Sequence, residues 1–328
     1  MNIAVSFSGE GRGHSTRMGA LCRHLLKKHN ICYWCPENIS SFFRSIIPDA
    51  RIYPIPLISL VKLHHRVLML KTAKLNIRPL FLQRETIDNI VKQLNGLDIS
   101  LVISDYEPFL PRAARIAKIP VLALNHQLAT QKHISPFDMQ GVSQFVANSF
   151  MMPYYSYSLS SSFFDGDIGP ILREHIKLKK PSHEDFYVVY LKGRMEKIAR
   201  KTLKKLGLKY LSFPDKNHDF ADSIASCKGV ISAAGHQIIS ECLHLNKPIF
   251  SIPERSQFEQ ILNAQMLARS GRGTIFYKGK LRQKLKAFIK KIGSYPFHEP
   301  DPEVSYIFHD DTENALTKIK GIISRIKG

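Results

Sequence analysis

Short apolar runs alternate with amphipathic segments along most of the chain, and this alternation restricts the fold more than any other feature. Strand patterns lie at Ile3–Phe7, Ile31–Cys35, Ile99–Ser104 and Val121–Asn125, with helix patterns such as Thr16–Lys28 between them. A parallel sheet covered by helices produces this rhythm, because each crossover between parallel strands needs a long connection, which is usually a helix. We therefore expect an α/β fold.

A second series of the same kind begins near residue 186 and continues to about residue 292. It follows a candidate linker at 164–170, and 328 residues are enough for about two domains. In two such domains a ligand would lie where both sheets present the carboxyl ends of their strands. The predicted parts are an N-terminal domain at 1–167, a C-terminal domain at 168–310 and a terminal helix at 311–328 that could cross back to the first domain.

The formal net charge of +20 requires an anionic partner or a strongly solvated surface. Basic residues gather at 57–82, among many Leu, Ile and Val residues, and at 277–291; residues 57–73 and 80–95 are predicted as helices. Aromatic residues do not interleave with these basic residues as base stacking requires, so we expect no nucleic-acid partner. The basic and apolar segment favours the cytoplasmic face of an anionic membrane, with an ordinary solvated face as the alternative.

The cysteines and the N-terminus point to a cytoplasmic protein. The five cysteines are odd in number, and Cys32 and Cys35 form a C-x-x-C on a probable strand without a second pair at zinc spacing. No apolar run reaches the roughly 18 residues of a membrane-spanning helix, and the N-terminus lacks the basic start of a signal peptide. We expect no bound metal, no disulfide framework and no membrane-spanning helix.

Polar residues follow the strands of the first series where their carboxyl ends would gather. Glycines at 9, 11 and 13 form a turn before His14, which occupies the position where a dinucleotide-binding motif needs its last glycine. His14 could act as a general base, or it could simply cap the helix or bind a phosphate. Asp105 could orient His14, or cap the next helix. Asn125, His126 and Gln127 form a third polar cluster on the same edge, for which an ordinary polar loop is the favoured interpretation.

The segment Ile231–Gly273 is expected to fold as strand, glycine turn, helix, strand, loop and helix. Gly235, His236 and Gln237 would open the first of these helices, where backbone amides can bind a phosphate. Glu241, one to two turns further, could accept both hydroxyls of a ribose unless it is a surface residue. Glu259 and Gln260 would begin the second helix and could bind sugar hydroxyls.

Three segments together resemble the GT-B glycosyltransferases, of the group that contains the lipid-linked sugar transferase MurG, galactosyltransferases that act on diacylglycerol and plant UDP-glycosyltransferases. They are the glycine loop and helix at 9–21, the linker at 168–173 and the nucleotide-sugar signature at 231–273, in the order found in that group. The resemblance implies two Rossmann-like domains that face each other across a cleft, an N-terminal one for the acceptor and a C-terminal one for the nucleotide sugar.

The resemblance also implies an inverting transfer of a hexosyl or N-acetylhexosaminyl group from a UDP-sugar, as donor substrate, to a lipid or lipid-linked hydroxyl. No bound cofactor is implied. A UDP-sugar 2-epimerase is an alternative, and so is a non-catalytic nucleotide-sugar-binding module, because Ala233 and Ala234 replace a polar residue and a glycine that relatives often carry. The implied site comprises His14 as base with Asp105, donor contacts at Gly13, Gly235, His236, Gln237, Glu241, Glu259 and Gln260, and acceptor-side residues Asn125 and His126.

Overall fold

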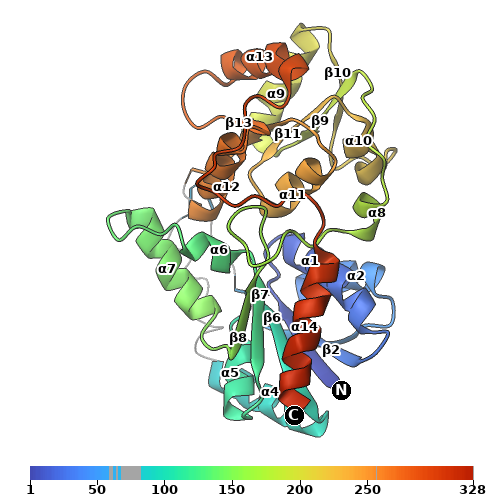
Figure 1. The fold of residues 1–328 in the computed structure, drawn as a ribbon, viewed down its shortest axis with the longest axis vertical. Helices are drawn as coiled ribbons and strands as arrows, with labels where there is room; N and C mark the ends of the chain where they lie inside the picture. The colour runs from blue at the N-terminus through green and yellow to red at the C-terminus, as the bar shows by residue number, and fades with distance from the viewer. Residues whose placement is uncertain (59–61, 64–65, 68–82, 256, 328) are drawn as a thin grey trace. The chain divides into compact units, whose positions relative to one another are not determined.

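The computed structural model describes residues 1–58, 62–63, 66–67, 83–255 and 257–327. The chain divides into two compact units, shown in Figure 1. The first unit contains residues 1–162, 166–173 and 311–328, and the second contains residues 163–165 and 174–310. The chain therefore passes between the units more than once, and the C-terminal residues belong to the first unit.

The first unit is built on a parallel sheet of six strands in the order β3-β2-β1-β6-β7-β8. This order places the sheet's topological switch between β1 and β6, where the crossovers on either side run in opposite directions. Ligands of open α/β sheets bind outside the carboxyl ends of strands at such a switch. The strands are β1 (Asn2–Phe7), β2 (Asn30–Pro36), β3 (Arg51–Ile55), β6 (Ile99–Asp105), β7 (Val121–Asn125) and β8 (Tyr157–Ser160).

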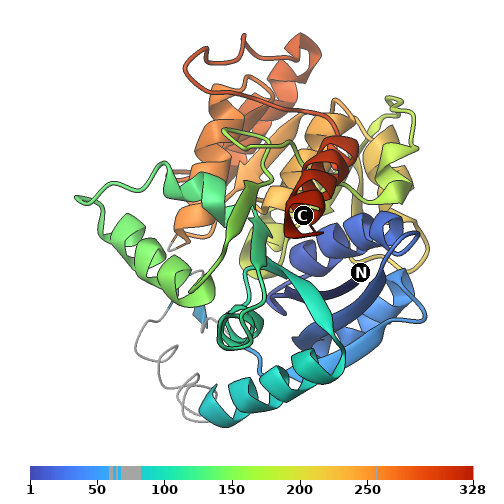
Figure 2. The same ribbon diagram turned by 60° about the horizontal axis from the view of Figure 1, so that its bottom comes forward.

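Helices cover both faces of this sheet, and the alternation of side chains along β1 explains why. Ile3, Val5 and Phe7 pack against α1 (Gly13–Leu25), α2 (Glu37–Ile46) and α14 (Thr312–Lys327), whereas Ala4 packs against α4 (Gln83–Gly96) and α5 (Phe109–Ile116). Figure 2 shows α1 and α14 on one side of the sheet and α4 on the other. Because both faces are buried, the strands read as nearly continuous apolar runs. Two further helices, α6 (Gln127–Gln131) and α7 (Met139–Met151), follow β7.

One predicted helix is wrong where the structure describes it. Residues 57–73 were expected to be helical, but Lys62–Leu63 (β4) and Arg66–Val67 (β5) form an antiparallel pair of strands. A short Leu- and Val-rich run fits either period, so its apolar pattern cannot separate strand from helix. The rest of the basic and apolar segment at 59–82 lies outside the described residues, and so does the start of the predicted helix at 80–95, of which α4 is the described part.

The second unit has a parallel sheet of five strands in the order β10-β9-β11-β12-β13. Its switch point lies between β9 and β11, and on one face the sheet packs against α9 and α13. The strands are β9 (Phe186–Tyr190), β10 (Lys209–Ser212), β11 (Gly229–Ala233), β12 (Ile249–Ile252) and β13 (Gly273–Ile275). The helices are α8 (Glu174–Lys177), α9 (Gly193–Lys205), α10 (Phe220–Ser226), α11 (His236–His244), α12 (Phe258–Arg269) and α13 (Leu281–Lys291), followed by the short helix η1 (Ile292–Ser294).

Candidate active site

The glycine loop after β1 lies at the switch point of the first sheet and leads into α1. The amide of Ser8 donates to the carbonyl oxygen of Asp105 over 3.1 Å, which ties the start of the loop to the end of β6. A β-carbon on Gly9 would lie 2.9 Å from the side chains of Asn38 and Pro36, and Gly11 has a φ of 75°. Both positions therefore favour glycine, one for space and one for its backbone conformation. The loop brings His14 into the first turn of α1.

His14 and Asp105 lie together, as their positions after neighbouring strands suggest. The distance from His14 Nδ1 to Asp105 Oδ1 is 2.9 Å, and the Asp105 side chain is wholly buried while that of His14 is 15% exposed. An ionised carboxylate can only accept hydrogen bonds, so Nδ1 carries the proton in this pair. That tautomer leaves the lone pair on Nε2, where His14 can take a proton from a hydroxyl group.

Arg17 is a third member of this cluster that sequence reasoning missed. Its guanidinium donates to Asp105 Oδ1 over 2.8 Å and to Oδ2 over 3.0 and 2.8 Å, and Nη2 lies 3.3 Å from His14 Nδ1. Burial works to raise the pKa of Asp105, but the charges and hydrogen bonds of Arg17 and His14 outweigh burial and lower that pKa. Arg17 follows His14 by three residues on α1, a spacing that puts both on one side of a helix and could have revealed the pairing.

The residues after Asp105 join the cluster to the rest of the first unit. Tyr106 has a φ of 56°, and its ring is nearly parallel to that of His14 at a centroid distance of 6.1 Å. Glu107 is 2% exposed and accepts hydrogen bonds from the amides of Phe109 and Leu110, at 2.5 and 3.0 Å. Burial raises the pKa of Glu107 to about 7 despite these bonds. Glu107, rather than Asp105, therefore caps the N-terminus of α5.

Of the predicted acceptor-side residues, Asn125 is the last residue of β7, next to β6, and His126 follows it; both side chains are buried. The amide group of Asn125 accepts from the Leu128 amide at 3.1 Å and donates to the sulfur of Met152 at 3.1 Å. His126 is the residue before α6. The contacts of Asn125 hold the β7–α6 turn, whereas the His14 side chain at this sheet edge is partly exposed.

In the second unit, the glycine turn after β11 opens α11 as predicted from the sequence. Gly235 precedes the helix with an ordinary φ of −69°, and a β-carbon there would meet only Ile238, at 3.8 Å. The space in front of the turn is thus open to the first amides of the helix, where an anion can bind. The side chain of Asn263 donates to the carbonyl oxygen of Ala234 over 3.1 Å and fixes the turn.

The other residues predicted on α11 are largely enclosed. His236 is 7% exposed, stacks on Phe163 at 5.7 Å and contacts Ser240. Glu241 is 1% exposed and accepts from the Gln237 side chain over 3.1 Å, so Glu241 is not an ordinary surface glutamate. A buried carboxylate on the first turns of a helix can bind paired hydroxyls when it has open access on one side.

Glu259 and Gln260 lie in the first turn of α12, also as predicted. The side-chain oxygen of Gln260 accepts from the amide of Glu254 over 3.1 Å, which holds the loop between β12 and α12. This part of the predicted donor-sugar site is therefore braced by a contact within its own loop.

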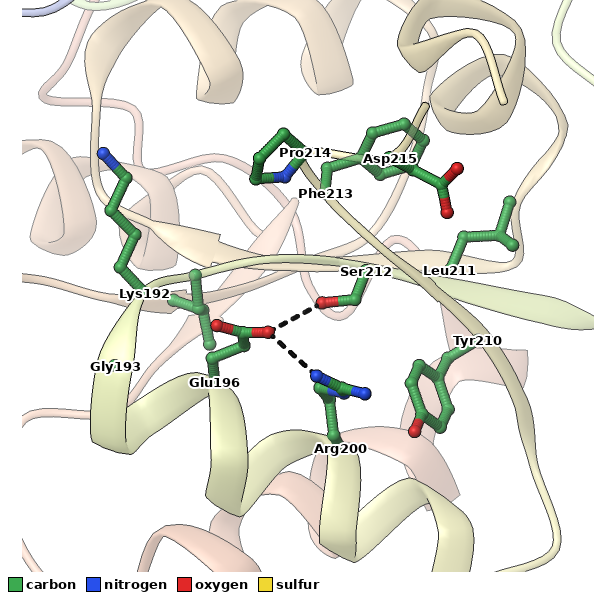
Figure 3. Close-up of a pocket in the computed structure, with 11 residues that line it drawn as sticks. Lys192, Gly193, Glu196, Arg200, Tyr210, Leu211, Ser212, Phe213, Pro214 and Asp215 are labelled. Carbon is green, nitrogen blue, oxygen red and sulfur yellow. Dashed lines mark hydrogen bonds and ion pairs between the residues drawn. The ribbon is translucent and has the colours of Figure 1, made fainter. Parts of the chain in front are cut away.

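A pocket of about 540 Å³ lies at the carboxyl ends of β9 and β10, and sequence reasoning missed it (Figure 3). Glu196 on its floor accepts from the Ser212 hydroxyl over 3.1 Å and from Arg200 over 3.2 Å. The turn into α9 passes through Gly193, whose φ is 64°. An apolar strand followed by Lys192-Gly193 and a helix is the signal that could have located it. The lining residues are Leu191, Lys192, Gly193, Glu196, Arg200, Tyr210, Leu211, Ser212, Phe213, Pro214 and Asp215.

The described residues contain no cluster of three or more His, Cys, Asp or Glu side chains that could hold a metal ion. Cys32 and Cys35 are free, and their spacing of three on β2 directs them to opposite faces of the sheet. Within the described part of the chain no helix is long and apolar enough to span a membrane.

Comparison with known proteins identifies the family of the chain. The profile of glycosyl transferase family 1 matches residues 1–215 and 207–293. The chain belongs to this family. The predicted resemblance to GT-B glycosyltransferases is thereby confirmed, and the two parallel sheets with interleaved helices are those of the GT-B fold.

Solved structures resemble this chain over nearly its whole length, at low sequence identity. MurG of Acinetobacter baumannii superimposes with a TM-score of 0.65 at 14% identity, covering 98% of this chain and 99% of the other. LpCGTa, solved in complex with UDP, superimposes with a TM-score of 0.62 at 13% identity, covering 90% of this chain and 91% of the other. The glycotransferase of kitacinnamycin superimposes with a TM-score of 0.58 at 14% identity, covering 90% of this chain and 91% of the other.

Among curated proteins, similarity is found with enzymes of Clostridium botulinum strains named UDP-N-acetylglucosamine–N-acetylmuramyl-(pentapeptide) pyrophosphoryl-undecaprenol N-acetylglucosamine transferase. The enzyme of strain Hall is 29% identical over 119 residues, which are 35% of this chain and 33% of that enzyme. The match thus spans about a third of the length of these curated relatives.

Proposed function

We propose that this glycosyltransferase moves a hexosyl or N-acetylhexosaminyl group from a UDP-sugar to a hydroxyl group of a lipid or lipid-linked acceptor, with inversion at the anomeric carbon. The observation that carries the proposal is the hydrogen bond between His14 and Asp105 at the switch point of the first sheet. The curated relatives, whose name gives a UDP-sugar donor and an undecaprenol-linked acceptor, support the choice of substrates. The LpCGTa structure was solved in complex with UDP, which supports UDP as the nucleotide of the donor.

In the proposed reaction His14 acts as the general base. Its Nε2 takes the proton of the acceptor hydroxyl while the hydroxyl oxygen attacks the anomeric carbon, and the bond from that carbon to the UDP oxygen breaks. Attack from the face opposite the leaving group inverts the configuration. Asp105 holds the imidazole ring and stabilises the imidazolium that forms.

The second unit would bind the donor. The open turn at Gly235 and the first amides of α11 would hold the diphosphate and stabilise its charge as it leaves. Glu241 would accept the ribose hydroxyls, Glu259 and Gln260 would contact the sugar, and the pocket at the ends of β9 and β10 offers room for the uracil ring. No bound cofactor takes part in these steps.

We place the reaction at the cytoplasmic face of an anionic membrane. The net charge of +20 and the undecaprenol-linked acceptor in the name of the curated relatives support this location.

The test is transfer from UDP-hexoses and UDP-N-acetylhexosamines to extracted membrane lipids, with free UDP as a second readout. His14→Ala and Glu241→Ala should each lower turnover strongly, whereas His218→Ala, at a half-exposed histidine of the second unit, should not. Full activity in both site variants would contradict the assignment. NMR of the donor alone would reveal a 2-epimerase, and UDP binding by calorimetry without product from any donor would favour the non-catalytic module suggested by Ala233 and Ala234.

A further inference from the structure

Tyr106 occupies a backbone conformation that aromatic residues rarely adopt. Its φ is 56°, and the other non-glycine residues of positive φ in the described part of the chain are two aspartates, a lysine and an asparagine. Short polar side chains tolerate this left-handed region, whereas a bulky residue there is an outlier. Such strain persists where the surrounding structure holds it, and it gathers at functional sites. Tyr106 directly follows Asp105, the carboxylate that binds His14.

Hydrogen bonds on both sides of Tyr106 hold this backbone turn. The carbonyl oxygen of the preceding Asp105 accepts from the Ser8 amide over 3.1 Å. The carbonyl oxygen of the following Glu107 accepts from the Ser104 hydroxyl over 3.3 Å, and the Glu107 carboxylate caps α5. Both neighbours of Tyr106 are therefore fixed, and the strained residue between them directs its side chain in one direction.

The Tyr106 side chain is held at its far end by α7. Its hydroxyl donates to Asn148 Oδ1 over 2.9 Å, and Asn148 is wholly buried. Gln144, one turn earlier on α7, donates to the same hydroxyl and to Asn148 Oδ1, at 3.2 and 2.8 Å. The backbone turn and the hydroxyl together fix the long axis of the tyrosine ring.

The tyrosine ring lies parallel to the imidazole of His14. The angle between the two rings is 8°, and their centroids are 6.1 Å apart, within the range of offset aromatic pairs. The 2.9 Å hydrogen bond to Asp105 directs Nδ1, but it leaves the imidazole free to tilt about that bond. The last side-chain torsion of a histidine has no sharp wells that would prevent such a tilt. A parallel ring beside the imidazole resists the tilt and thereby preserves the direction of Nε2.

We propose that Tyr106 is a positioning residue for His14, whose imidazole it holds so that Nε2 stays directed at the acceptor hydroxyl. This inference rests on the proposed function, in which His14 is the general base. A general base must lie within hydrogen-bond reach of the proton that it takes. A misdirected Nε2 therefore slows the chemical step without changing how the donor binds. Tyr106 acts through His14 and takes no part in the proton transfer itself.

Substitution by glycine separates the role of the ring from the stability of the fold. Tyr106→Gly removes the ring but suits the backbone, because glycine adopts a φ of 56° without strain. The variant should melt close to the wild type, while kcat falls about ten- to a hundredfold and the donor KM stays within about twofold. Tyr106→Phe keeps the ring and should restore most of kcat. Tyr155→Gly is the matched control, since Tyr155 is a 42% exposed tyrosine of the same unit, and its kcat should not change.

The proton on His14 Nδ1 gives a second readout that does not depend on turnover. Proton NMR observes an Nδ1 proton that a buried carboxylate protects from exchange with water, and His14→Ala, which lacks it, assigns the signal. Loss of the Tyr106 ring should speed this exchange about tenfold or more, because the imidazole opens more often. Asn148→Leu keeps the ring and the backbone turn but removes the acceptor of the hydroxyl, so it should speed the exchange less. It tests the inference even if Tyr106→Gly fails to fold.

Three results would overturn the role of Tyr106: wild-type kcat or wild-type proton exchange in Tyr106→Gly, a Tyr106→Phe variant as slow as Tyr106→Gly, or an equal loss in Tyr155→Gly. The proposed function fails separately. If the wild-type chain turns over no UDP-sugar while the ring still governs the Nδ1 proton, the general-base chemistry is refuted and the ring contact stands. If the wild-type chain transfers sugar and Tyr106→Gly does so equally fast, only the role of Tyr106 is refuted.

Discussion

Arg17 donates hydrogen bonds to both carboxylate oxygens of Asp105, so the candidate catalytic carboxylate is shared between a histidine and an arginine. The Asp105 side chain is wholly buried and that of Arg17 is 4% exposed. A buried carboxylate without such a partner would tend to be protonated. Arg17 thus keeps Asp105 in the ionised form that accepts the Nδ1 proton of His14, and it acts as a positioning residue.

Removing Arg17 should destabilise the first unit in a manner that depends on pH. Arg17→Gln removes the main counter-charge of the buried Asp105, with an expected loss of about 3–5 kcal/mol of unfolding free energy near neutral pH. The lowered pKa of Asp105 stabilises the wild-type fold above the carboxylate's ordinary value of 3.8, and this contribution is lost as pH falls through the folded-state pKa. Without Arg17 that pKa rises, so acid unfolding should begin at higher pH. Melting temperatures from about pH 3 to 7 measure both effects. If the melting temperature of Arg17→Gln falls at the same acidic pH as that of the wild type, this account is contradicted. Arg12→Gln, on the same loop, is the control.

Loss of the imidazole should affect turnover far more than donor binding. General bases contribute about 10²–10⁴-fold to rate, so His14→Ala should lower kcat by that order while the donor KM stays close to wild type. Steady-state kinetics with the UDP-sugar found active gives both values. A variant that loses donor affinity but keeps kcat would assign His14 to binding instead.

Glu107 should make the fold less stable as pH rises from about 4.5 to 7. Its folded-state pKa of about 7 lies above the ordinary value of 4.5, so the native state binds more protons than the unfolded state in this interval. This difference in proton binding lowers the free energy of unfolding by about 3 kcal/mol between pH 4.5 and pH 7. The loss is complete near pH 7 and absent below pH 4.5. Glu107→Gln retains one of the two oxygens that accept from the amides of Phe109 and Leu110, and it cannot ionise. The difference in melting temperature between variant and wild type should therefore grow in favour of the variant as pH rises, and a constant difference would exclude the effect.

Glu241 should govern nucleotide affinity. Hydrogen bonds to a charged group are worth about 1.5–3 kcal/mol, so Glu241→Ala should weaken UDP binding about ten- to a hundredfold in calorimetry. Glu303→Ala is the control, because Glu303 is an 84% exposed glutamate of the same unit. Equal affinities for the Glu241 variant and wild type would remove Glu241 from the ribose site.

Much of the site could be predicted because parallel strands gather their carboxyl ends at one edge. That rule alone suggested that His14 and Asp105 are neighbours, although 91 positions separate them. The rule about strand ends could not reveal Arg17, because Arg17 lies on a helix. A basic residue on a helix is usually solvated, and the burial of Arg17 depends on how α1 packs on the sheet. Glu107 was missed for a similar reason, because cap geometry is fixed by the turn at Tyr106. The helix expected at 57–73 was wrong at β4 and β5 because short apolar runs do not define a period.

The place of α14 in the first unit has a consequence for how this protein is made. Ala315, Leu316, Ile319 and Ile323 belong to the same core as Ile3 and Val5. The ribosome releases the strands of the first sheet long before it releases this helix, so that face of the sheet stays without its final cover until the second unit has been synthesised. The first unit to be translated is the last to complete its core.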